Sequence, residues 1–405
     1  MKSENRMDIG YLGEYLQWRG DLTFAQAPFC AADSLMLTML SYLTPEKVTV
    51  PGEKNVGIRL GELARRYDLF YVPEKNPGRL SMTARAPELL KRMASTVRFS
   101  GVVLEDYSNH TDIAQDGRFA AMTFSAGKDS IYIAYRGTDN NIIGWKEDFN
   151  MSYLESVPAQ KRAADYLKKQ AGARVSAGTF SRKIMTGGHS KGGNLAVYAA
   201  VCADEKTAER IVEVHNFDGP GFSEEFFRLP GYPAVKNKII NFLPQGSLVG
   251  RLFEHRGKMC IVRSEARGIL QHIPFSWKIR GGNFVFEEEF DRSSQIFDDM
   301  MTAWISGKND EEKKVFIDGV FDLLEEYGID TTEELKHDLT KVRPVFKLLK
   351  GMPKEDRDVF FRFMAALLRE AGLAVQKNLF GNEEATDSSE KEAADFRQSD
   401  ITPGE

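Results

Sequence analysis

The sequence predicts an α/β protein, in which a mostly parallel, doubly wound sheet carries helices on both faces and is followed by an all-helical C-terminal extension. Two observations predict this class. Short apolar runs alternate with helical segments between about residues 99 and 263, and such alternation favours parallel strands joined by helices. From about Ser293 onward the strand signals stop, and only helical periodicity remains.

The N-terminal part is expected to be mainly helical. Residues 1–20 are polar and are expected to be loose, with aromatic side chains as anchors. Helices are expected at Asp33–Leu43, Val56–Tyr67 and Ala86–Ser95. Asp33 is expected to be an N-cap residue. Pro87 is expected at the first turn of its helix, where a proline loses no hydrogen bond.

The central part is expected to form the sheet. Two strand-like runs, Arg118–Ser125 and Ser130–Arg136, are separated by a short segment with a glycine, which predicts a hairpin. Helices are expected at Pro158–Lys169 and Gly193–Ala203. Further strands are expected at Phe99–Tyr107, around Ile184, and at Ile211–Phe217, Lys238–Leu243 and Met259–Arg263.

The chain is expected to have four parts: a polar N-terminal segment (1–20), an α/β domain (21–290), a helical extension (291–376) and a disordered acidic tail (377–405). The helices of the extension are expected at Phe297–Ile305, Glu312–Tyr327, Thr332–Leu349 and Asp356–Gly372. The tail is acidic and poor in apolar residues, a composition typical of disorder.

Composition argues against several classes of protein. The 405 residues are 42% hydrophobic and 28% charged, as in an ordinary globular protein. The net charge of −5 gives no reason to expect nucleic-acid binding. No apolar run has the length of a transmembrane helix, and the polar N-terminus lacks the apolar stretch of a signal peptide. Three scattered cysteines indicate thiols in a reducing compartment, so a cytoplasmic location is expected.

Residues 188–192 read Gly-His-Ser-Lys-Gly, which fits the pattern G-x-S-x-G. A strand-like run precedes them and an alanine-rich helical run follows. In this context the pattern predicts a nucleophile elbow, a sharp turn that lifts the hydroxyl of Ser190 to the top of the sheet. The N–H of Lys191 then lies at a helix N-terminus, where it can hold an oxyanion. The fold expected for the α/β domain is therefore an α/β-hydrolase.

A serine nucleophile needs a base, and in this fold an acid and then a histidine follow the serine along the chain. Three histidines follow Ser190 before the helical extension: His215, His255 and His272. His215 lies inside a predicted strand, which is a poor position for a base. His272 lies in a loop-like stretch after the last parallel strand and is the first choice, with His255 as the alternative.

The acid is expected at the C-terminal end of a strand that follows the elbow. Asp218 ends the next strand and is the first choice. Glu254 is the nearest acid after the later strand, and a dyad helped by Ser247 or by a carbonyl stays open. The second oxyanion donor is expected at Thr138, in the loop after an earlier strand, because Gly137 allows close approach there.

Several segments resemble the class 3 (fungal-type) lipases. Residues 135–138 read Tyr-Arg-Gly-Thr, Trp145 and Asp148 follow, and Gly-His-Ser-x-Gly-Gly comes about fifty residues later. In those lipases a Phe-Arg-Gly-Ser/Thr segment supplies the oxyanion hole, and the serine lies in Gly-His-Ser-Leu-Gly-Gly.

More closely, the chain resembles a poorly characterised bacterial family of lipase-3-like proteins. The shared segments are an early Asp-x-Leu helix ending in Ser-Tyr-Leu (33–43), Gly-His-Ser-Lys-Gly-Gly-Asn-Leu-Ala (188–196), Phe-Asp-Gly-Pro-Gly-Phe (217–222) and Gln-His…Ser-Trp (271–277). The resemblance covers roughly residues 20–285. It implies that Ser190 is the nucleophile, His272 the base and Thr138 an oxyanion residue.

Two residues depart from the class 3 pattern. Lys191 replaces the usual aliphatic residue after the serine, a change expected to affect the preferred leaving group or head group. Ser247 lies near the position at which those lipases carry their aspartate, so the identity of the acid stays open between Asp218, Glu254 and none.

These observations predict a serine hydrolase that cleaves a carboxylic ester, with a lipid or small acyl ester as its substrate by resemblance only. The alternatives are a non-catalytic binding or scaffold protein with the same fold, and a peptidase or acyltransferase that uses the same site. No metal and no organic cofactor is expected, because no His/Cys/Asp cluster and no Rossmann glycine pattern occurs.

Overall fold

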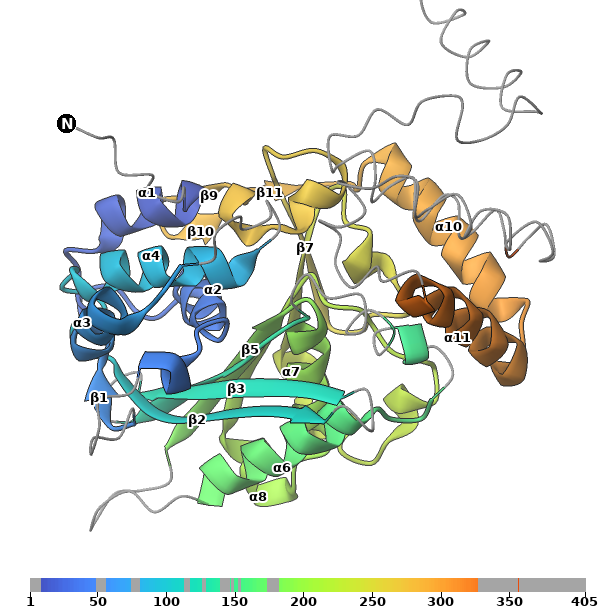
Figure 1. The fold of residues 1–405 in the computed structure, drawn as a ribbon, viewed down its shortest axis with the longest axis horizontal. Helices are drawn as coiled ribbons and strands as arrows, with labels where there is room; N and C mark the ends of the chain where they lie inside the picture. The colour runs from blue at the N-terminus through green and yellow to red at the C-terminus, as the bar shows by residue number, and fades with distance from the viewer. Residues whose placement is uncertain are drawn as a thin grey trace, which may run out of the picture.

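In the part of the chain that the structure describes, a nine-stranded sheet forms the framework, with the order β1-β2-β3-β4-β5-β6-β7-β8-β11 (Figure 1). The computed structural model describes residues 9–48, 56–73, 81–112, 117–125, 129–138, 146, 149–151, 154–172, 182–326 and 356. The strands of the sheet are β1 (Ile58–Arg59), β2 (Val103–Asp112), β3 (Gly117–Ser125), β4 (Ser130–Tyr135), β5 (Lys183–His189), β6 (Ile211–Phe217), β7 (Ile239–Pro244), β8 (Lys258–Val262) and β11 (Phe286–Glu287). Two short strands, β9 (Ile279–Arg280) and β10 (Asn283–Phe284), pair with each other.

Strands β4 to β8 run parallel, and antiparallel strands extend the sheet on both sides. The predicted hairpin is the antiparallel pair β3–β4. Along β4, Ile131 and Ile133 belong to one apolar core, and Tyr132 and Ala134 belong to the other. Because both faces of β4 are buried, this strand reads as a nearly continuous apolar run.

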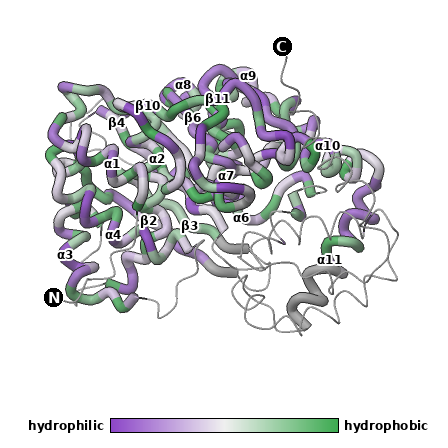
Figure 2. The backbone as a smooth tube through the Cα atoms, turned by 90° about the horizontal axis from the view of Figure 1, so that it is seen from above, coloured by the Kyte–Doolittle hydropathy of each residue, from purple (hydrophilic) through white to green (hydrophobic). Residues whose placement is uncertain are grey.

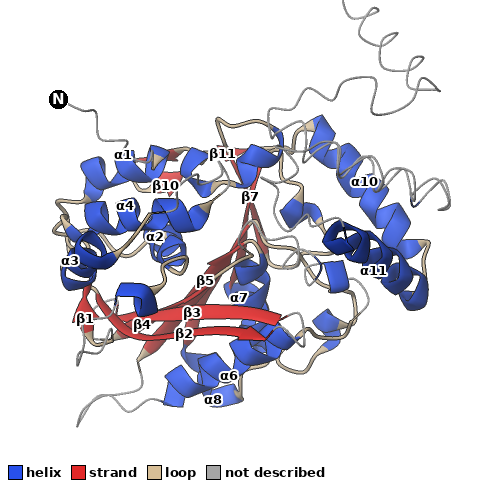
Figure 3. Cartoon of the chain, in the orientation of Figure 1, coloured by secondary structure: helices blue, strands red, loops and turns tan. Residues whose placement is uncertain are grey.

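One face of the sheet is covered by helices that follow β4 (Figure 3). They are α6 (Pro158–Gly172), α7 (Lys191–Val201), α8 (Glu205–Arg210) and α9 (Tyr232–Val235), and they share one apolar core with the sheet. From β4 to β8 each crossover moves to the next neighbouring strand. Because crossovers between parallel strands are right-handed, this order keeps their helices on a single face.

The opposite face is covered by helices that precede β2 (Figure 1). They are α1 (Gly10–Arg19), α2 (Ala31–Leu40), α3 (Leu60–Phe70) and α4 (Met82–Ala94), and they form the second apolar core with the sheet. The predicted α/β architecture, a mostly parallel sheet with helices on both faces, is thus confirmed. The two helical layers come from different stretches of the chain, because the strand order does not reverse.

Helix α1 corrects the expectation of a loose N-terminal segment for residues 10–19. Leu12, Tyr15 and Leu16 are buried at helical spacing on one face of this helix. The hydroxyl of Tyr15 donates to Asp33 Oδ1 at 2.8 Å, which fixes α1 to the start of α2. The expectation of an aromatic anchor is therefore met by Tyr15.

Helices α2 and α4 begin earlier than expected, each at a different cap residue. The N-cap residue of α2 is Cys30, and Asp33 lies at the third helical position, where its carboxylate accepts the N–H of Cys30 at 2.9 Å. Helix α4 begins after Ser81, whose hydroxyl accepts the N–H of Ala84 at 3.2 Å. Pro87 therefore lies inside α4 rather than in its first turn, because Ser81, the cap residue six positions earlier, sets the start of the helix.

Helices α10 (Arg292–Ser306) and α11 (Asp310–Glu326) lie on the side of the sheet away from α1 and α3 (Figures 1 and 2). Phe297, Met301 and Trp304 pack against Leu252, which follows β7. The helices expected at 332–349 and 356–372 and the tail lie outside the described residues, except Asp356, whose carboxylate accepts from Trp304 Nε1 at 2.9 Å.

Short 3₁₀ helices occur in the connections: η1 (Pro45–Val48), η3 (Phe226–Arg228), η4 (Lys236–Lys238), η5 (Val249–Arg251), η6 (Gly268–His272) and η7 (Pro274–Ser276). Two of them, η5 and η6, lie at the candidate site. None of the helices in the described ranges has the length and apolar composition that crossing a bilayer requires.

Candidate active site

Ser190 lies at a sharp turn between β5 and α7. β5 ends at His189, α7 begins at Lys191, and Ser190 between them has φ 58° and ψ −136°. Such a left-handed conformation is strained for a serine, and it is the geometry of a strand-to-helix elbow. The N–H of Ser190 donates to Phe217 O at 2.9 Å, so the end of β6 holds the turn in place.

The loop after β4 lies directly beside Ser190. A Cβ at Gly137 would lie 2.3 Å from His189 O and 2.8 Å from Ser190 Cβ, so only glycine fits there. Thr138, the next residue, is half-buried. Lys191 is the first residue of α7, and its side chain is buried, with 1% of its surface exposed. The two expected oxyanion residues therefore adjoin Gly137 and Ser190 along the chain.

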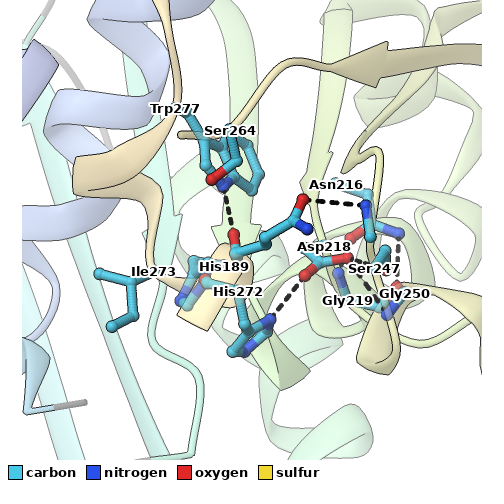
Figure 4. Close-up of polar contacts among 12 residues, drawn as sticks. His189, Asn216, Asp218, Gly219, Ser247, Gly250, Ser264, His272, Ile273 and Trp277 are labelled. Atoms are coloured by element: carbon cyan, nitrogen blue, oxygen red, sulfur yellow. Dashed lines mark hydrogen bonds and ion pairs between the residues drawn. The ribbon is translucent and has the colours of Figure 1, made fainter. Parts of the chain in front are cut away.

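Asp218 lies at the end of β6, is fully buried and has a positive φ of 53°. Its Oδ1 accepts hydrogen bonds from the hydroxyl of Ser247 and from the N–H of Gly250, the latter at 3.2 Å (Figure 4). Both donors belong to the loop after β7. A carboxylate that loses its contact with water needs such donors, and this loop supplies them.

His272 ends η6, and its Nδ1 lies 2.7 Å from Asp218 Oδ2 (Figure 4). Because a carboxylate accepts, Nδ1 carries the proton of the neutral ring and Nε2 presents its lone pair. Within the ranges that the structure describes, Nε2 has no hydrogen-bond partner. His272 thus has the tautomer that a general base requires.

His189 connects the turn at Ser190 to the loop of His272. Its Nε2–H donates to His272 O at 2.8 Å, and the hydroxyl of Tyr42 donates to its Nδ1 at 2.9 Å. The centroids of the His189 and His272 rings are 4.5 Å apart. Burial and the neighbouring His272 hold the pKa of His189 well below its usual range, so the ring stays neutral. His189 therefore connects the two loops structurally.

The alternative candidates for the base and the acid are engaged with other residues. Nε2 of His255 donates to Gly250 O at 2.6 Å, so this ring is turned into the loop after β7 rather than toward Ser190. Nδ1 of His215 lies 2.7 Å from Ser34 Oγ, on the face that α2 covers. Glu254 forms a surface ion pair with Arg256.

The buried side chain of His255 should make the stability of the fold sensitive to acid. Burial lowers its pKa to about 4, whereas a histidine in the unfolded chain titrates near about 6.5. Between these values the unfolded chain binds more protons, so the stability present above about pH 6.5 is lost as the pH falls toward 4. We expect the free energy of unfolding to fall by about 2 kcal/mol from this residue between pH 7 and pH 5.

Urea unfolding at several pH values measures this effect. His255→Gln is the matched variant, because glutamine can still donate to Gly250 O and does not titrate. The variant should lose less stability than the wild type between pH 7 and pH 5. Identical pH dependence in both proteins would contradict the prediction.

No three His, Cys, Asp or Glu side chains are grouped so that they could hold a metal ion, within the residues that the structure describes. The polar atoms of the site are instead engaged with one another through Asp218 and its donors. The arrangement of a strained serine, a histidine and a buried carboxylate is suited to nucleophilic acyl transfer.

Comparison with known proteins gives one family. The family model described as Mbeg1-like matches residues 93–322, more than half of the 405 residues. Among solved structures, the crystal structure of M37 lipase is similar, with 14% identity over 54% of this chain and 69% of that chain, and a TM-score of 0.31. No curated protein sequence matches the chain. The matched range contains every candidate site residue from Thr138 to His272, and the chain belongs to the Mbeg1-like family.

Proposed function

We propose that the chain is a serine hydrolase that cleaves a carboxylic ester through an acyl-enzyme on Ser190. The observation that carries this proposal is the Asp218–His272 pair, joined at 2.7 Å, on the loops around the strained turn at Ser190. A backbone outlier, a buried carboxylate and a histidine of fixed tautomer together are the parts of a serine nucleophile site.

In the first half of the reaction, Ser190 Oγ attacks the carbonyl carbon of the ester while His272 Nε2 accepts the hydroxyl proton. The imidazolium that forms keeps its Nδ1–H on Asp218 Oδ2, whose negative charge stabilises it. The tetrahedral intermediate then expels the alcohol, which takes the proton from His272 Nε2. The products of this half are the free alcohol and an ester of the acyl group with Ser190.

The oxyanion of the intermediate is held by the N–H groups of Lys191 and Thr138. Lys191 supports this role because its N–H lies at the N-terminus of α7, where the helix dipole favours negative charge. Thr138 supports it because Gly137 brings that loop into contact with Ser190. In the second half, water attacks the acyl-enzyme with His272 as its base, which releases the carboxylic acid and restores Ser190.

The class of substrate is a lipid or small acyl ester. The resemblance of the motifs to lipase-like proteins supports this class. An acyltransferase would use the same acyl-enzyme and replace water by another acceptor.

A fluorophosphonate probe tests the proposal, since it reacts covalently with activated serines. We expect the folded wild-type protein to be labelled at Ser190 and to hydrolyse p-nitrophenyl esters. Ser190→Ala should lose labelling and about 10⁶-fold of kcat, because an alanine has no nucleophile. Mass spectrometry of the labelled peptide identifies the site.

The histidines provide the matched comparison. His272→Gln should lose labelling and turnover, whereas His255→Gln should keep both, because the ring of His255 is turned toward Gly250. No labelling of folded wild-type protein would reject the enzyme and favour the binding or scaffold alternative. Turnover that survives His272→Gln would reject His272 as the base.

A further inference from the structure

The first turn of α10 is connected to the acid by hydrogen bonds. Ser294 is fully buried, and its hydroxyl donates to Ser247 O at 2.5 Å. The hydroxyl of Ser247 in turn donates to Asp218 Oδ1. A chain of two hydrogen bonds therefore runs from α10 through the loop after β7 to the carboxylate that holds His272.

A second connection runs from the same turn to the histidine. Gln271, the residue before His272, accepts the N–H of Gly246 at 2.9 Å and donates from Nε2 to Asp291 Oδ2 at 3.2 Å. The N–H of Asp291 donates to Gln245 O at 2.7 Å. Gln271 therefore links the loop of His272 both to the loop after β7 and to the start of α10.

The side chains of Asp291 and Ser294 form hydrogen bonds with residues outside α10. Asp291 is the N-cap residue of α10, yet its side chain makes no capping hydrogen bond. Such a cap typically contributes about 1 kcal/mol to stability, and Asp291 makes the contact with Gln271 instead. Gly246, Gln271 and Asp291 are closely packed. A Cβ at Gly246 would lie 2.1 Å from Gln271 Nε2 and 3.0 Å from Asp291 Oδ2.

We propose that Asp291 and Ser294, at the start of α10, are positioning residues for the Asp218–His272 pair and act through Gln271 and Ser247. This inference rests on the proposed function, because the pair needs fixed geometry only if it moves a proton. A base must stay within hydrogen-bond reach of the nucleophile, and a displacement of about 1 Å can cost about 10²-fold in rate. The first turn of α10 thereby contributes to the reaction through the Asp218–His272 pair.

Ser294→Ala is the direct test, with Ser293→Ala as the matched control, because Ser293 is exposed in the same turn. We expect Ser294→Ala to lower kcat by between about 10-fold and 100-fold with KM unchanged, since the lost hydrogen bond is remote from the substrate. Ser293→Ala should behave like the wild type. Ser294→Thr keeps the hydroxyl and should restore part of kcat.

A second measurement does not depend on turnover. The Nδ1–H of His272 donates to Asp218 Oδ2 at 2.7 Å, so we expect its NMR resonance far downfield, where it reports the geometry of the pair. Ser294→Ala should shift or broaden this resonance, and Ser293→Ala should not. If Ser294→Ala fails to fold, Asp291→Ala at an exposed position makes the same test through Gln271.

The outcomes separate this inference from the proposed function. Wild-type kcat together with an unchanged resonance in Ser294→Ala or Asp291→Ala would overturn the positioning role and leave the hydrolase intact. A wild-type protein without esterase activity, in which Ser294→Ala still moves the resonance, would reject the hydrolase and retain the positioning of the pair by α10.

Discussion

Asp218→Asn is expected to lower kcat by about 10⁴-fold while the protein stays folded. The asparagine oxygen can still accept from Ser247 and from the N–H of Gly250, which engage Oδ1 of the aspartate. Its amide nitrogen then replaces Oδ2 and faces Nδ1 of His272. Because an amide N–H is a donor, the ring must carry its proton on Nε2, and that tautomer cannot accept the proton of Ser190.

Steady-state kinetics with a p-nitrophenyl ester measure this loss, and the thermal transition checks the fold. Glu254→Gln is the matched control, because Glu254 is the other acid that the sequence offers and it pairs with Arg256 at the surface. We expect Glu254→Gln to keep the kcat of the wild type. Near-normal turnover in Asp218→Asn would show that the acid is not Asp218.

The turn at Ser190 could be predicted because its determinants are local. Glycines two residues before and two after the serine, a strand before it and a helix after it are all visible within residues 183–201. The surroundings of Asp218 could not be predicted in the same way. The Asp218-Gly-Pro sequence suits an Asx turn as well as an acid, and the donors Ser247 and Gly250 lie 29 and 32 residues further along the chain.

The fold shows the same contrast between features with a local sequence signal and features that depend on distant residues. Strand β6 begins and ends where predicted, at Ile211–Phe217, because a run with three β-branched residues ends at the turn sequence Asp218-Gly-Pro. Strands β1, β9, β10 and β11 have two residues each, so no apolar pattern could indicate them. The link between α10 and the site depends on Gln271 and Ser294, whose hydrogen bonds span 20 and 47 residues and leave no periodic signal.

A second large effect is expected in the helical layer over the sheet, where Arg98 and Asp33 form a buried ion pair. The side chains are 1% and 0% exposed, and Arg98 Nε and Nη2 lie 2.6 Å and 2.5 Å from the two carboxylate oxygens. The guanidinium also donates to three backbone carbonyls, of Leu22, Ala27 and Pro28, at 3.1–3.2 Å. One side chain thereby joins residues 22–28 to the start of α2.

Arg98→Met should therefore lower the free energy of unfolding by about 3–5 kcal/mol, because it leaves a buried carboxylate without its counter-charge. Tyr15 and the N–H of Cys30 still donate to Asp33, but neither carries a positive charge. Urea unfolding measures the loss. Arg65→Ala, which breaks an exposed pair with Glu62, is the comparison and should cost at most about 1 kcal/mol.

The double variant Asp33→Leu/Arg98→Met distinguishes charge from packing. Replacing both members of a buried pair by apolar side chains removes the unpaired charge, so the double variant should be more stable than Arg98→Met alone. If the double variant is less stable than the single one, the hydrogen bonds that Tyr15 and the N–H of Cys30 donate to Asp33 contribute more than its unpaired charge costs. If Arg98→Met costs no more than Arg65→Ala, the buried pair does not hold α2 in place. Tyr42, two residues beyond α2, would then owe its position beside His189 to the apolar core and to the hydrogen bonds that tie Ser34 and Thr38 of α2 to Tyr132.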